Sequence, residues 1–447
     1  MKPFPVYRNE ELVGEARAEL MARSTAAVFD PDLNDSVRAI VEDVRENGDE
    51  AVIRALERHD RVVCPPDRPC VEAEEIAAAS RSIPDELAWA IRIGIANIRR
   101  YNERILETAS WSEELEPGVV LGEQARPIVS AGLFVPSGKG SFPSVLIHLA
   151  TPALVAGVPE IAVVVPPNAG SLEIDPAVLF VAGELGLTNV FRANGPAGIA
   201  ALAFGTKTFP RVARVVGPGS AAVVAAQVQV QLAGCSTVLL FGPSESLIVA
   251  DKTADPLLLA ADFVTEAEHG PDSACLLVTP SESLVDAVAT EVEDALGELP
   301  ETRQAWAREA LARGGAVLVS SLDEAVAFSN EYAPEHLQLA VRDPQALAPS
   351  VEHAGEILLG QLPFAAANYL VGVPNTLPTG GFARVSSGVT ARTFLKSSST
   401  ASVTGPALER LAESSVVLAE HESFPAHSRA LQLRATHRTA TVEVSDV

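Results

Sequence analysis

From Ile128 onward, short runs of β-branched and apolar residues alternate with longer alanine-rich stretches. The runs IVSAGLFVP, EIAVVVPP, ACLLVTP and HLQLAV are apolar almost throughout, which is typical of parallel strands that are covered on both faces. The stretches between them, such as SVLIHLATPALVAG and PAVLFVAGELG, have the length and composition of helices. This alternation predicts the α/β class, with parallel sheets in two Rossmann-like units in tandem.

Outside the alternating region, the sequence predicts helices, loops and a short arm. Residues 1–26 are charged and are expected to form the arm, whereas apolar positions recur at helical spacing over 34–59 and 84–107. The segment from Gly360 to Gly388 is rich in Gly, Pro, Asn and Ser, which predicts a site-forming loop or a linker. Residues 390–440 predict a further helical segment and an extended end.

The charge balance excludes several classes of partner. The chain has 447 residues, with 33 Lys and Arg against 58 Asp and Glu, so its net charge is −25. Such a surface repels phosphate backbones and anionic lipid, so neither nucleic acid nor membrane is an expected partner. The polar start MKPFPVYRNEEL and the absence of a long apolar run lead us to expect a cytoplasmic protein.

The four cysteines do not form a recognisable framework. Cys64 and Cys70 share a proline-rich loop, but no second cysteine pair or nearby histidine completes a zinc ribbon. Cys235 and Cys275 are isolated in the sequence. We therefore expect four ordinary reduced thiols.

Two glycine-containing segments resemble nucleotide-binding loops. Gly217–Ala222 follows the apolar run VARVV and opens a helical stretch, as a pyrophosphate-binding G-x-G-x-x-A turn does. The acid expected about 20 residues later is missing, since Ser236, Thr237 and Val238 lie there, so a plain tight turn fits equally well. Gly132–Lys139 has the wrong spacing for a triphosphate loop, and Gly140 follows the lysine where Ser or Thr is required.

Three pairs of an acid and a histidine are the remaining candidates for chemistry. Glu266 and His269 lie three residues apart at the end of an apolar helix, so their side chains share a face. Glu335 and His336 stand together at the start of a predicted strand, and another such pair lies in the segment 422–427. The first pair could ligate zinc or iron, and the second could supply a base with a pKa near neutrality, but a solvated surface accounts more simply for each pair taken alone.

Ordered blocks along the chain resemble the histidinol dehydrogenase family. They run from about Val28 to Arg434 and include GLFVPSGK, LATPALVAG, GIAALAFGT, RVVGPG, FGPSESLIVAD, AEHGPDS, YAPEHLQL, HAGEILLG and a closing Pro-Ala-His. The resemblance implies a homodimer and a zinc site completed by the partner's C-terminal segment. It also implies oxidation of a primary alcohol by NAD, twice, to the acid.

The resemblance assigns roles to the predicted segments. Residues 1–26 form the N-terminal arm, and 27–133 together with 247–389 form a Rossmann-like catalytic domain. Residues 134–246 form a Rossmann-like cofactor domain, and 390–447 form a C-terminal dimerisation extension with helices.

The family's zinc ligands are a Gln, a His, an Asp and a His of the partner subunit. The matching positions here are Glu266, His269, Asn368 and His427. The amide has become a carboxylate and the carboxylate an amide, so the set keeps its oxygen donors and its single negative charge. We expect a compensating exchange that retains the metal; decay of an inactive site is the alternative.

The acid–base pair matches the family, whereas the substrate positions match in part. Glu335 and His336 occupy the acid–base positions, with His336 taking the alcohol proton and Glu335 helping to activate water in the second oxidation. Ser244 and Glu422 match substrate contacts, but Asn375 stands where the family has a histidine.

The cofactor positions also depart from the family. Phe134 stands in place of a tyrosine, Ala197 in place of a glutamine and Ser220 in place of an asparagine, whereas Pro136 and Gly219 are retained. Fewer hydrogen bonds to NAD are therefore expected.

These departures predict a zinc-dependent, NAD-linked oxidation of a small-molecule primary alcohol other than histidinol. A genuine L-histidinol dehydrogenase of histidine biosynthesis with an atypical metal site is one alternative, and a non-catalytic dimeric scaffold is another.

Overall fold

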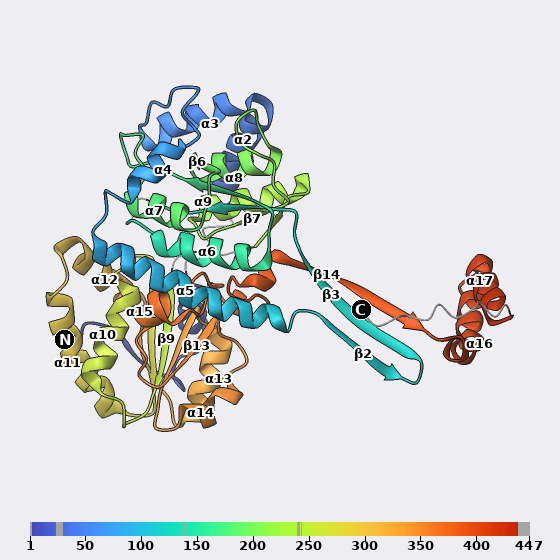
Figure 1. The fold of residues 1–447 in the computed structure, drawn as a ribbon. Coiled ribbons are helices and arrows are strands. Elements are labelled where there is room, and N and C mark those ends of the chain that lie inside the picture. The colour runs from blue at the N-terminus through green and yellow to red at the C-terminus, as the bar shows by residue number, and fades with distance from the viewer. Residues whose placement is uncertain (1, 24–29, 138–139, 239–241, 243, 437–447) are drawn as a thin grey trace. The chain divides into compact units, whose positions relative to one another are not determined.

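The computed structural model describes residues 2–23, 30–137, 140–238, 242 and 244–436. The chain divides into two compact units (Figure 1). The first comprises Met1–Arg104 and Pro127–Phe394, and the second Ile105–Arg126 and Leu395–Val447. Each unit is described by itself.

The first unit contains two parallel sheets. The six-stranded sheet has the order β1-β11-β10-β9-β12-β13, and the five-stranded sheet has the order β6-β5-β4-β7-β8. The strand pairs of both sheets are parallel over the described residues. The strands are β1 (Val6–Arg8), β4 (Ser130–Phe134), β5 (Glu160–Val165), β6 (Val190–Arg192), β7 (Arg214–Val216), β8 (Ser236–Thr237), β9 (Glu245–Ala250), β10 (Ala274–Thr279), β11 (Gly315–Leu318), β12 (His336–Ala340) and β13 (Glu356–Leu359).

The two sheets share one winding pattern. If the edge strand β1 is set aside, the strand that comes first in the sequence lies in the middle of each sheet. The next two strands along the chain lie on one side of it, and the last two lie on the other side. This is the order of a doubly wound sheet, which leaves a crevice where the winding reverses. The prediction of a mixed α/β fold with parallel sheets is confirmed.

Helices cover both sheets, and four of them begin in the same way. At α2, α7, α10 and α14 an aspartate caps the helix by accepting a backbone N–H, and a proline occupies the first turn. The helices of the first unit are α1 (Gly14–Ala22), α2 (Pro31–Asn47), α3 (Asp49–Ala55), α4 (Ala73–Ala79), α5 (Asp85–Glu107, which ends in the second unit), α6 (Pro143–Ala156), α7 (Pro176–Glu184), α8 (Gly195–Phe204), α9 (Ala221–Val230), α10 (Pro256–Ala267), α11 (Glu282–Gly297), α12 (Glu301–Arg313), α13 (Leu322–Tyr332), α14 (Pro344–Leu347) and α15 (Phe364–Ala366).

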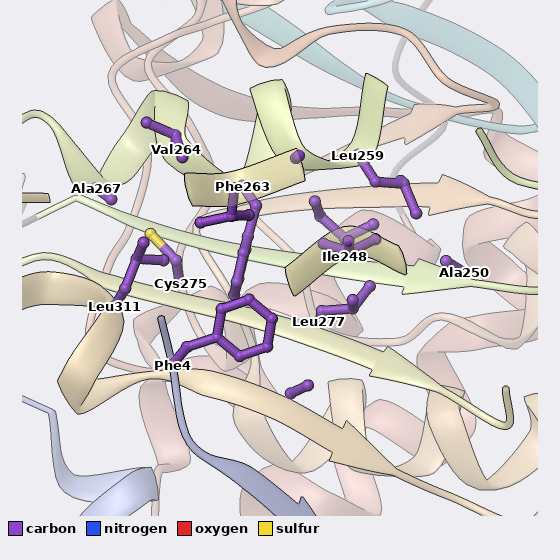
Figure 2. Close-up of a cluster of buried hydrophobic side chains, with 14 of the residues drawn as sticks. Phe4, Ile248, Ala250, Leu259, Phe263, Val264, Ala267, Cys275, Leu277 and Leu311 are labelled. Carbon is purple, nitrogen blue, oxygen red and sulfur yellow. The ribbon is translucent and has the colours of Figure 1, made fainter. Parts of the chain in front are cut away.

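Separate apolar clusters hold the helices on the sheets. One cluster joins α10, α11 and α12 to the six-stranded sheet, and in it the Phe4 ring meets the Phe263 ring edge-on at 5.2 Å (Figure 2). Another joins α1 and α13 to the opposite face of that sheet. A third contains residues of α2, α8 and α9 and of the five-stranded sheet.

The packing differs from the predicted grouping in three places. The arm supplies the edge strand β1, which pairs with β11. Helix α2 packs with α8 and α9, although the sequence analysis grouped residues 27–133 with 247–389. Strand β4 begins at Ser130, inside the range assigned to the other domain. Hydrophobic periodicity shows that a helix is amphipathic but not which sheet it covers. The functional division of the domains stays a prediction.

The described part of the second unit contains three strands and two helices. The sheet order is β14-β3-β2, from β2 (Trp111–Glu116), β3 (Val119–Pro127) and β14 (Leu395–Val403), and the helices are α16 (Gly405–His421) and α17 (Pro425–Thr436). The pair β2–β3 is antiparallel. The sequence analysis did not predict these strands, because β2 is exposed at every position and shows no alternation.

Within the described residues, no helix has the length and apolar character needed to cross a membrane.

A close approach between β4 and β7 yields a stability prediction. A Cβ atom at Gly217 would lie 2.2 Å from the carbonyl oxygen of Phe134. Gly217→Ala should therefore lower the free energy of unfolding by about 1–3 kcal/mol, as overpacking does. Gly297→Ala is the matched control, because a Cβ there meets nothing within 4 Å. Equal midpoints of chemical denaturation for the two variants would contradict the prediction.

Candidate active site

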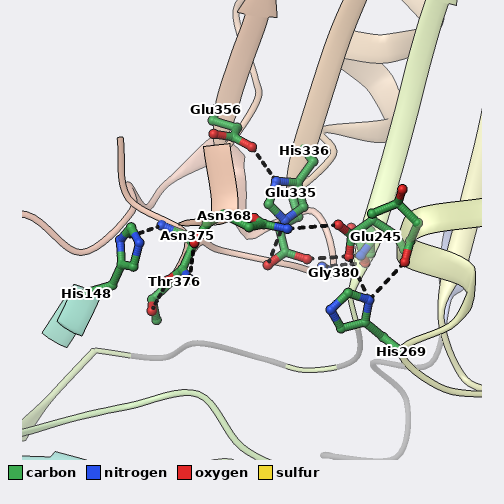
Figure 3. Close-up of polar contacts among 12 residues, drawn as sticks. His148, Glu245, His269, Glu335, His336, Glu356, Asn368, Asn375, Thr376 and Gly380 are labelled. Carbon is green, nitrogen blue, oxygen red and sulfur yellow. Dashed lines mark hydrogen bonds and ion pairs between the residues drawn. The ribbon is translucent and has the colours of Figure 1, made fainter. Parts of the chain in front are cut away.

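The amino edge of the six-stranded sheet brings together three of the polar side chains. Glu245, His336 and Glu356 are the first residues of β9, β12 and β13. These strands are neighbours, with His336 in register with both Ser246 and Glu356. Because amino ends of adjacent parallel strands lie at one edge, residues about 90 positions apart in sequence meet there (Figure 3).

His336 lies between two carboxylates and is almost completely buried. Its Nδ1 contacts Oε1 of Glu356, and its Nε2 lies 3.8 Å from Oε1 of Glu335. A carboxylate accepts hydrogen bonds, so Glu356 fixes the Nδ1–H form of the ring and leaves Nε2 facing Glu335. The sequence analysis missed Glu356, whose only signal is its position at the start of a strand.

Backbone geometry holds Glu335 in place. Ala333 ends α13 in the left-handed conformation at φ 51°, which an alanine rarely adopts. Two residues later, Oε2 of Glu335 accepts a 2.9 Å hydrogen bond from the backbone N–H of Glu245. The turn that ends α13 therefore comes directly before the segment in which Glu335 bonds to the first residue of β9.

The carboxylate of Glu245 is itself paired. Its Oε2 accepts a 2.8 Å hydrogen bond from Nη1 of Arg23, and its Oε1 accepts a 2.7 Å bond from the backbone N–H of Gly380. The guanidinium of Arg23 lies 3.6 Å from the centre of the Tyr332 ring. Arg23 and Glu245 thus form a buried pair, and the backbone of Glu245 bonds to Glu335.

Burial raises the pKa of Glu335, and neighbouring carboxylates raise the pKa of His336. Burial raises the pKa of Glu335 to about 8, although His336 opposes the shift. Burial alone lowers the pKa of His336, but Glu335, Glu266 and Glu356 outweigh it and raise that pKa to about 10. Burial also raises the pKa of Glu245, against the effect of Arg23. The cluster therefore tends to keep protons that free side chains would release.

Three of the four predicted metal ligands lie together. Oε2 of Glu266 is 3.2 Å from Nδ1 of His269, and Oε1 of Glu266 accepts a 3.3 Å hydrogen bond from Nδ2 of Asn368. The Glu266 side chain is 1% exposed. Among the residues that the structure describes, no three His, Cys, Asp or Glu side chains are close enough together to bind one metal ion. The third candidate donor in this set is therefore the amide of Asn368.

The loop after α15 connects this set to a histidine that the sequence analysis missed. Asn375 donates from Nδ2 to the carbonyl of Asn368, and its backbone N–H donates to Nδ1 of His148 at 3.2 Å. Gly372 lets the loop approach α5, because a Cβ there would lie 2.7 Å from the carbonyl of Asn97. Burial lowers the pKa of His148 to about 3, so this ring is neutral. A lone histidine in an apolar helix gave no signal in the sequence.

The remaining predicted substrate and metal residues are placed as follows. Ser244 lies directly before β9, partly buried, and its carbonyl accepts from the backbone N–H of Ala274 at 3.2 Å. Glu422 and His427 belong to the second unit, at the end of α16 and in α17, and both are exposed.

All five predicted cofactor residues line one cavity of about 730 Å³. It lies at the carboxyl edge of the five-stranded sheet, where Phe134 ends β4. Ala197 lies in the first turn of α8, and Ser220 caps α9 after Gly219. Pro136 completes the set. Two helix N-termini and the crevice of a doubly wound sheet suit a dinucleotide.

Comparison with known proteins assigns the family. A fold with parallel sheets, a cavity at a strand edge and a buried acid–base pair defines an α/β enzyme of the dinucleotide-binding class. The family model for histidinol dehydrogenase matches residues 23–435, so the chain belongs to the histidinol dehydrogenase family.

Relatives and a solved structure agree with this assignment. The histidinol dehydrogenase of Thermosynechococcus vestitus is 41% identical over 89% of this chain and 92% of its own, and that of Xanthomonas euvesicatoria is 37% identical over 95% and 97%. The crystal structure of histidinol dehydrogenase from Elizabethkingia anophelis matches with a TM-score of 0.90 at 32% identity, over 97% of this chain and 98% of that one. Membership in this family also supports the predicted cofactors, NAD and zinc.

One prediction was wrong. The sequence analysis expected a substrate other than histidinol, because single positions depart from the family pattern. Relatives at about 40% identity over most of the chain carry the name histidinol dehydrogenase, which favours the alternative of a genuine histidinol dehydrogenase. Neighbouring side chains can compensate for changes at a few contact positions. A comparison of single positions with the family pattern does not take these neighbours into account.

The buried pair of Arg23 and Glu245 yields the prediction of this section. Arg23→Met leaves a carboxylate buried without its cation, so the free energy of unfolding should fall by about 3–5 kcal/mol. The loss should shrink as pH falls towards about 4.5, because the pKa of buried Glu245 is raised and the folded state takes up the proton before the unfolded chain does. Arg8→Met, in an exposed pair with Glu282, should change stability by less than about 1 kcal/mol. A pH-independent loss for Arg23→Met would contradict this.

Proposed function

We propose that this protein oxidises L-histidinol with NAD, in two hydride transfers, to the corresponding carboxylic acid. The observation that carries the proposal is the burial of Glu335 and His336 in one cluster with Glu266, in a chain whose relatives are named histidinol dehydrogenase. The substrate follows from those relatives, and the chemistry follows from the cluster.

His336 is suited to take the proton of the alcohol. Glu356 fixes its Nδ1–H, so the free Nε2 is the basic atom that faces the site. As the hydroxyl proton moves to Nε2, a hydride leaves the carbinol carbon for NAD and an aldehyde forms. Glu335 would then help a water molecule to add to the aldehyde, and NAD bound in the cavity would supply the hydride acceptor for each oxidation.

Glu266, His269 and Asn368 fit a zinc ion. Glu266 is a buried carboxylate with no Lys or Arg salt bridge among the described residues, and a cation would neutralise it. The amide nitrogen and oxygen of Asn368 exchange places by a half-turn, which would present Oδ1 as a third donor. Bound zinc would polarise the hydroxyl or a neighbouring heteroatom of the substrate.

The cavity of about 730 Å³ is the proposed NAD site. Ala197 and Ser220 present backbone N–H groups at the starts of α8 and α9, which attract the pyrophosphate without side-chain hydrogen bonds. Backbone recognition explains how the departures at Phe134, Ala197 and Ser220 are tolerated.

We also propose a homodimer with shared active sites, in which the partner supplies the fourth zinc ligand from position 427 and a substrate contact from position 422. Support comes from the second unit, whose helices expose large apolar side chains. These are Leu411, Val417, Leu418, Phe424 and Leu433.

Turnover tests the proposed function. Zinc-supplied protein should produce NADH from L-histidinol, and at least about tenfold faster than from simple primary alcohols, as expected of a site with specific polar contacts. Absence of NADH formation, or equal rates with the simple alcohols, would contradict the proposal.

The pH dependence should report on His336. The base must be unprotonated, and its pKa is raised, so kcat/KM should fall as pH drops below an apparent pKa that lies above the ordinary value for histidine. Glu356→Gln removes one carboxylate that raises this pKa, so the profile should move to lower pH. Glu352→Gln, at an exposed position, should leave the profile unchanged. An unmoved profile in Glu356→Gln would argue against His336 as the base.

A double-mutant cycle tests the exchanged metal ligands. Glu266→Gln and Asn368→Asp should each weaken zinc binding, and the double variant, which restores the family's residues, should regain wild-type affinity. Calorimetric zinc titration of metal-free protein measures all four corners. Additive losses would show that the two positions do not compensate each other.

A further inference from the structure

A buried glutamine on β12 bonds to two other elements of the first unit. Gln338 is fully buried, and its Nε2 donates to Oδ2 of Asp262 on α10 at 2.6 Å. The same nitrogen donates to the carbonyl oxygen of Leu362 at 2.8 Å. Because a carbonyl oxygen only accepts, the amide nitrogen rather than the amide oxygen must face this pair of neighbours. Gln338 therefore links β12 to α10 and to the segment that leads into α15.

Each of these three elements carries a residue of the proposed site. His336 is the first residue of β12, and Glu266 lies near the end of α10. The segment after Leu362 forms α15 and then the π-helical turn η5 (Ala367–Val371), which carries Asn368. In α15, the ring of Phe364 meets the ring of His336 edge-on at 5.8 Å. One amide group thus touches every element that holds the proposed base and the buried part of the proposed zinc set.

The pair Gln338 and Asp262 repeats the arrangement of the site one step further along the strand. His336, Gln338 and Ala340 alternate in β12 and share the face that packs on α10, with an advance of about 6.6 Å from one to the next. Asp262 and Glu266 lie four residues apart on one face of α10, an advance of about 6 Å. Burial lowers the pKa of His336, but carboxylates that include Glu266 raise it, so Glu266 lies near the ring. The bond between Gln338 and Asp262 thus fixes the position of α10 along β12, and this position sets the separation of the two site residues.

The pair is costly to bury. Burial raises the pKa of Asp262, and the hydrogen bond from Gln338 offsets only part of that shift. Oε1 of Gln338 is buried and has no hydrogen-bond partner among the residues that the structure describes. An unpaired acceptor costs free energy, and apolar side chains of similar volume often replace a buried polar pair without loss of stability. A costly contact one step behind the site points to a role in alignment rather than in stability.

We infer that Gln338 is a positioning residue, whose hydrogen bonds to Asp262 and to the carbonyl of Leu362 hold the proposed base and zinc ligands at a fixed separation. The inference rests on the proposed function, because it takes His336 as the base and Glu266 as a zinc ligand. It goes beyond that function in assigning their alignment to a fully buried side chain behind them. Loss of such an outer partner changes metal affinity or activity about 10- to 100-fold.

Two variants separate positioning from a structural contribution. Asp262→Leu combined with Gln338→Met removes both polar groups at similar volume, so no buried charge remains unpaired. Asp262→Asn keeps an oxygen that accepts from Gln338 and removes only the charge. Thr279→Val is the matched control, because it removes a buried acceptor at the carboxyl end of β10, where Oγ1 of Thr279 accepts from the backbone N–H of Ser281 at 3.1 Å.

Calorimetric titration of the metal-free full chain with zinc, and turnover of L-histidinol by zinc-saturated protein, make the comparison. The double variant should bind zinc at least about tenfold more weakly and show a kcat at least about tenfold lower. Its dissociation constant for NAD should stay within about twofold of wild type, because the proposed cofactor cavity lies at the other sheet. Asp262→Asn and Thr279→Val should stay within about threefold of wild type in all three quantities. Circular dichroism and chemical denaturation check that the double variant folds as stably as wild type.

Wild-type zinc affinity and kcat in the double variant would overturn the inference. An equal loss in Asp262→Asn would also overturn it, because that variant keeps the bond. A loss that extends equally to NAD binding would show a general structural role and count against positioning as well. If the double variant does not fold, Asp262→Ala breaks the bond to α10 without leaving a buried charge, and the same contrast with Asp262→Asn is expected.

The zinc dissociation constants are measured whether or not turnover occurs, so failure here is distinct from failure of the proposed function. Turnover of histidinol by the wild type with no contrast between the variants would remove the role of Gln338 alone. A contrast in zinc affinity without turnover by any form would refute the proposed function and leave the positioning role standing.

Discussion

The structure depends on the burial of several carboxylates at the amino edge of one sheet. Glu245, Glu266, Glu335 and Glu356 are all buried there, with Arg23 and His336 as the buried cations beside them. Charges leave water only when they are paired or hydrogen-bonded. Arg23 stabilises Glu245, backbone N–H groups hold Glu245 and Glu335, and His336 lies between Glu335 and Glu356. Glu266 has no Lys or Arg partner among the described residues, so it is the carboxylate at which we propose that a metal ion binds.

The same crowding gives the site its chemistry. Neighbouring carboxylates raise the pKa of His336, which makes it a strong base once it is deprotonated, and burial raises the pKa of Glu335. Groups with shifted pKa values are common at functional sites, where the fold tolerates the loss of stability that they cause. The proposed cofactor cavity lies at the carboxyl edge of the five-stranded sheet, and the proposed acid–base cluster lies at the amino edge of the six-stranded sheet.

The sequence predicted the class of the fold better than it predicted which helices pack against which sheet. Apolar runs identified the parallel strands, because strands covered on both faces have few polar positions. The polar hairpin β2–β3 has no such pattern and was missed. Asp-Pro caps mark the starts of α2, α7, α10 and α14 but do not say which sheet those helices cover.

For the site, the resemblance supplied residues that physical patterns alone left undecided. Glu335 and His336 stand out only beside a family pattern, since adjacent acids and histidines are common on surfaces. Glu356, Arg23 and His148 could not be predicted, because their roles arise from contacts between segments 20 to more than 200 residues apart. The predicted change of substrate was wrong because it rested on single positions such as Asn375, whereas relatives at about 40% identity over most of the chain carry the name histidinol dehydrogenase.

Proton release on zinc binding tests the central claim most directly. If the buried carboxylates and His336 hold protons because their charges crowd together, a divalent cation at Glu266 must expel some of them. Calorimetric titration of metal-free protein with zinc near neutral pH, in buffers of different ionisation enthalpy, counts those protons. The account predicts net release by the wild type and a smaller release by Glu335→Gln. No release, or the same release from the variant, would contradict it.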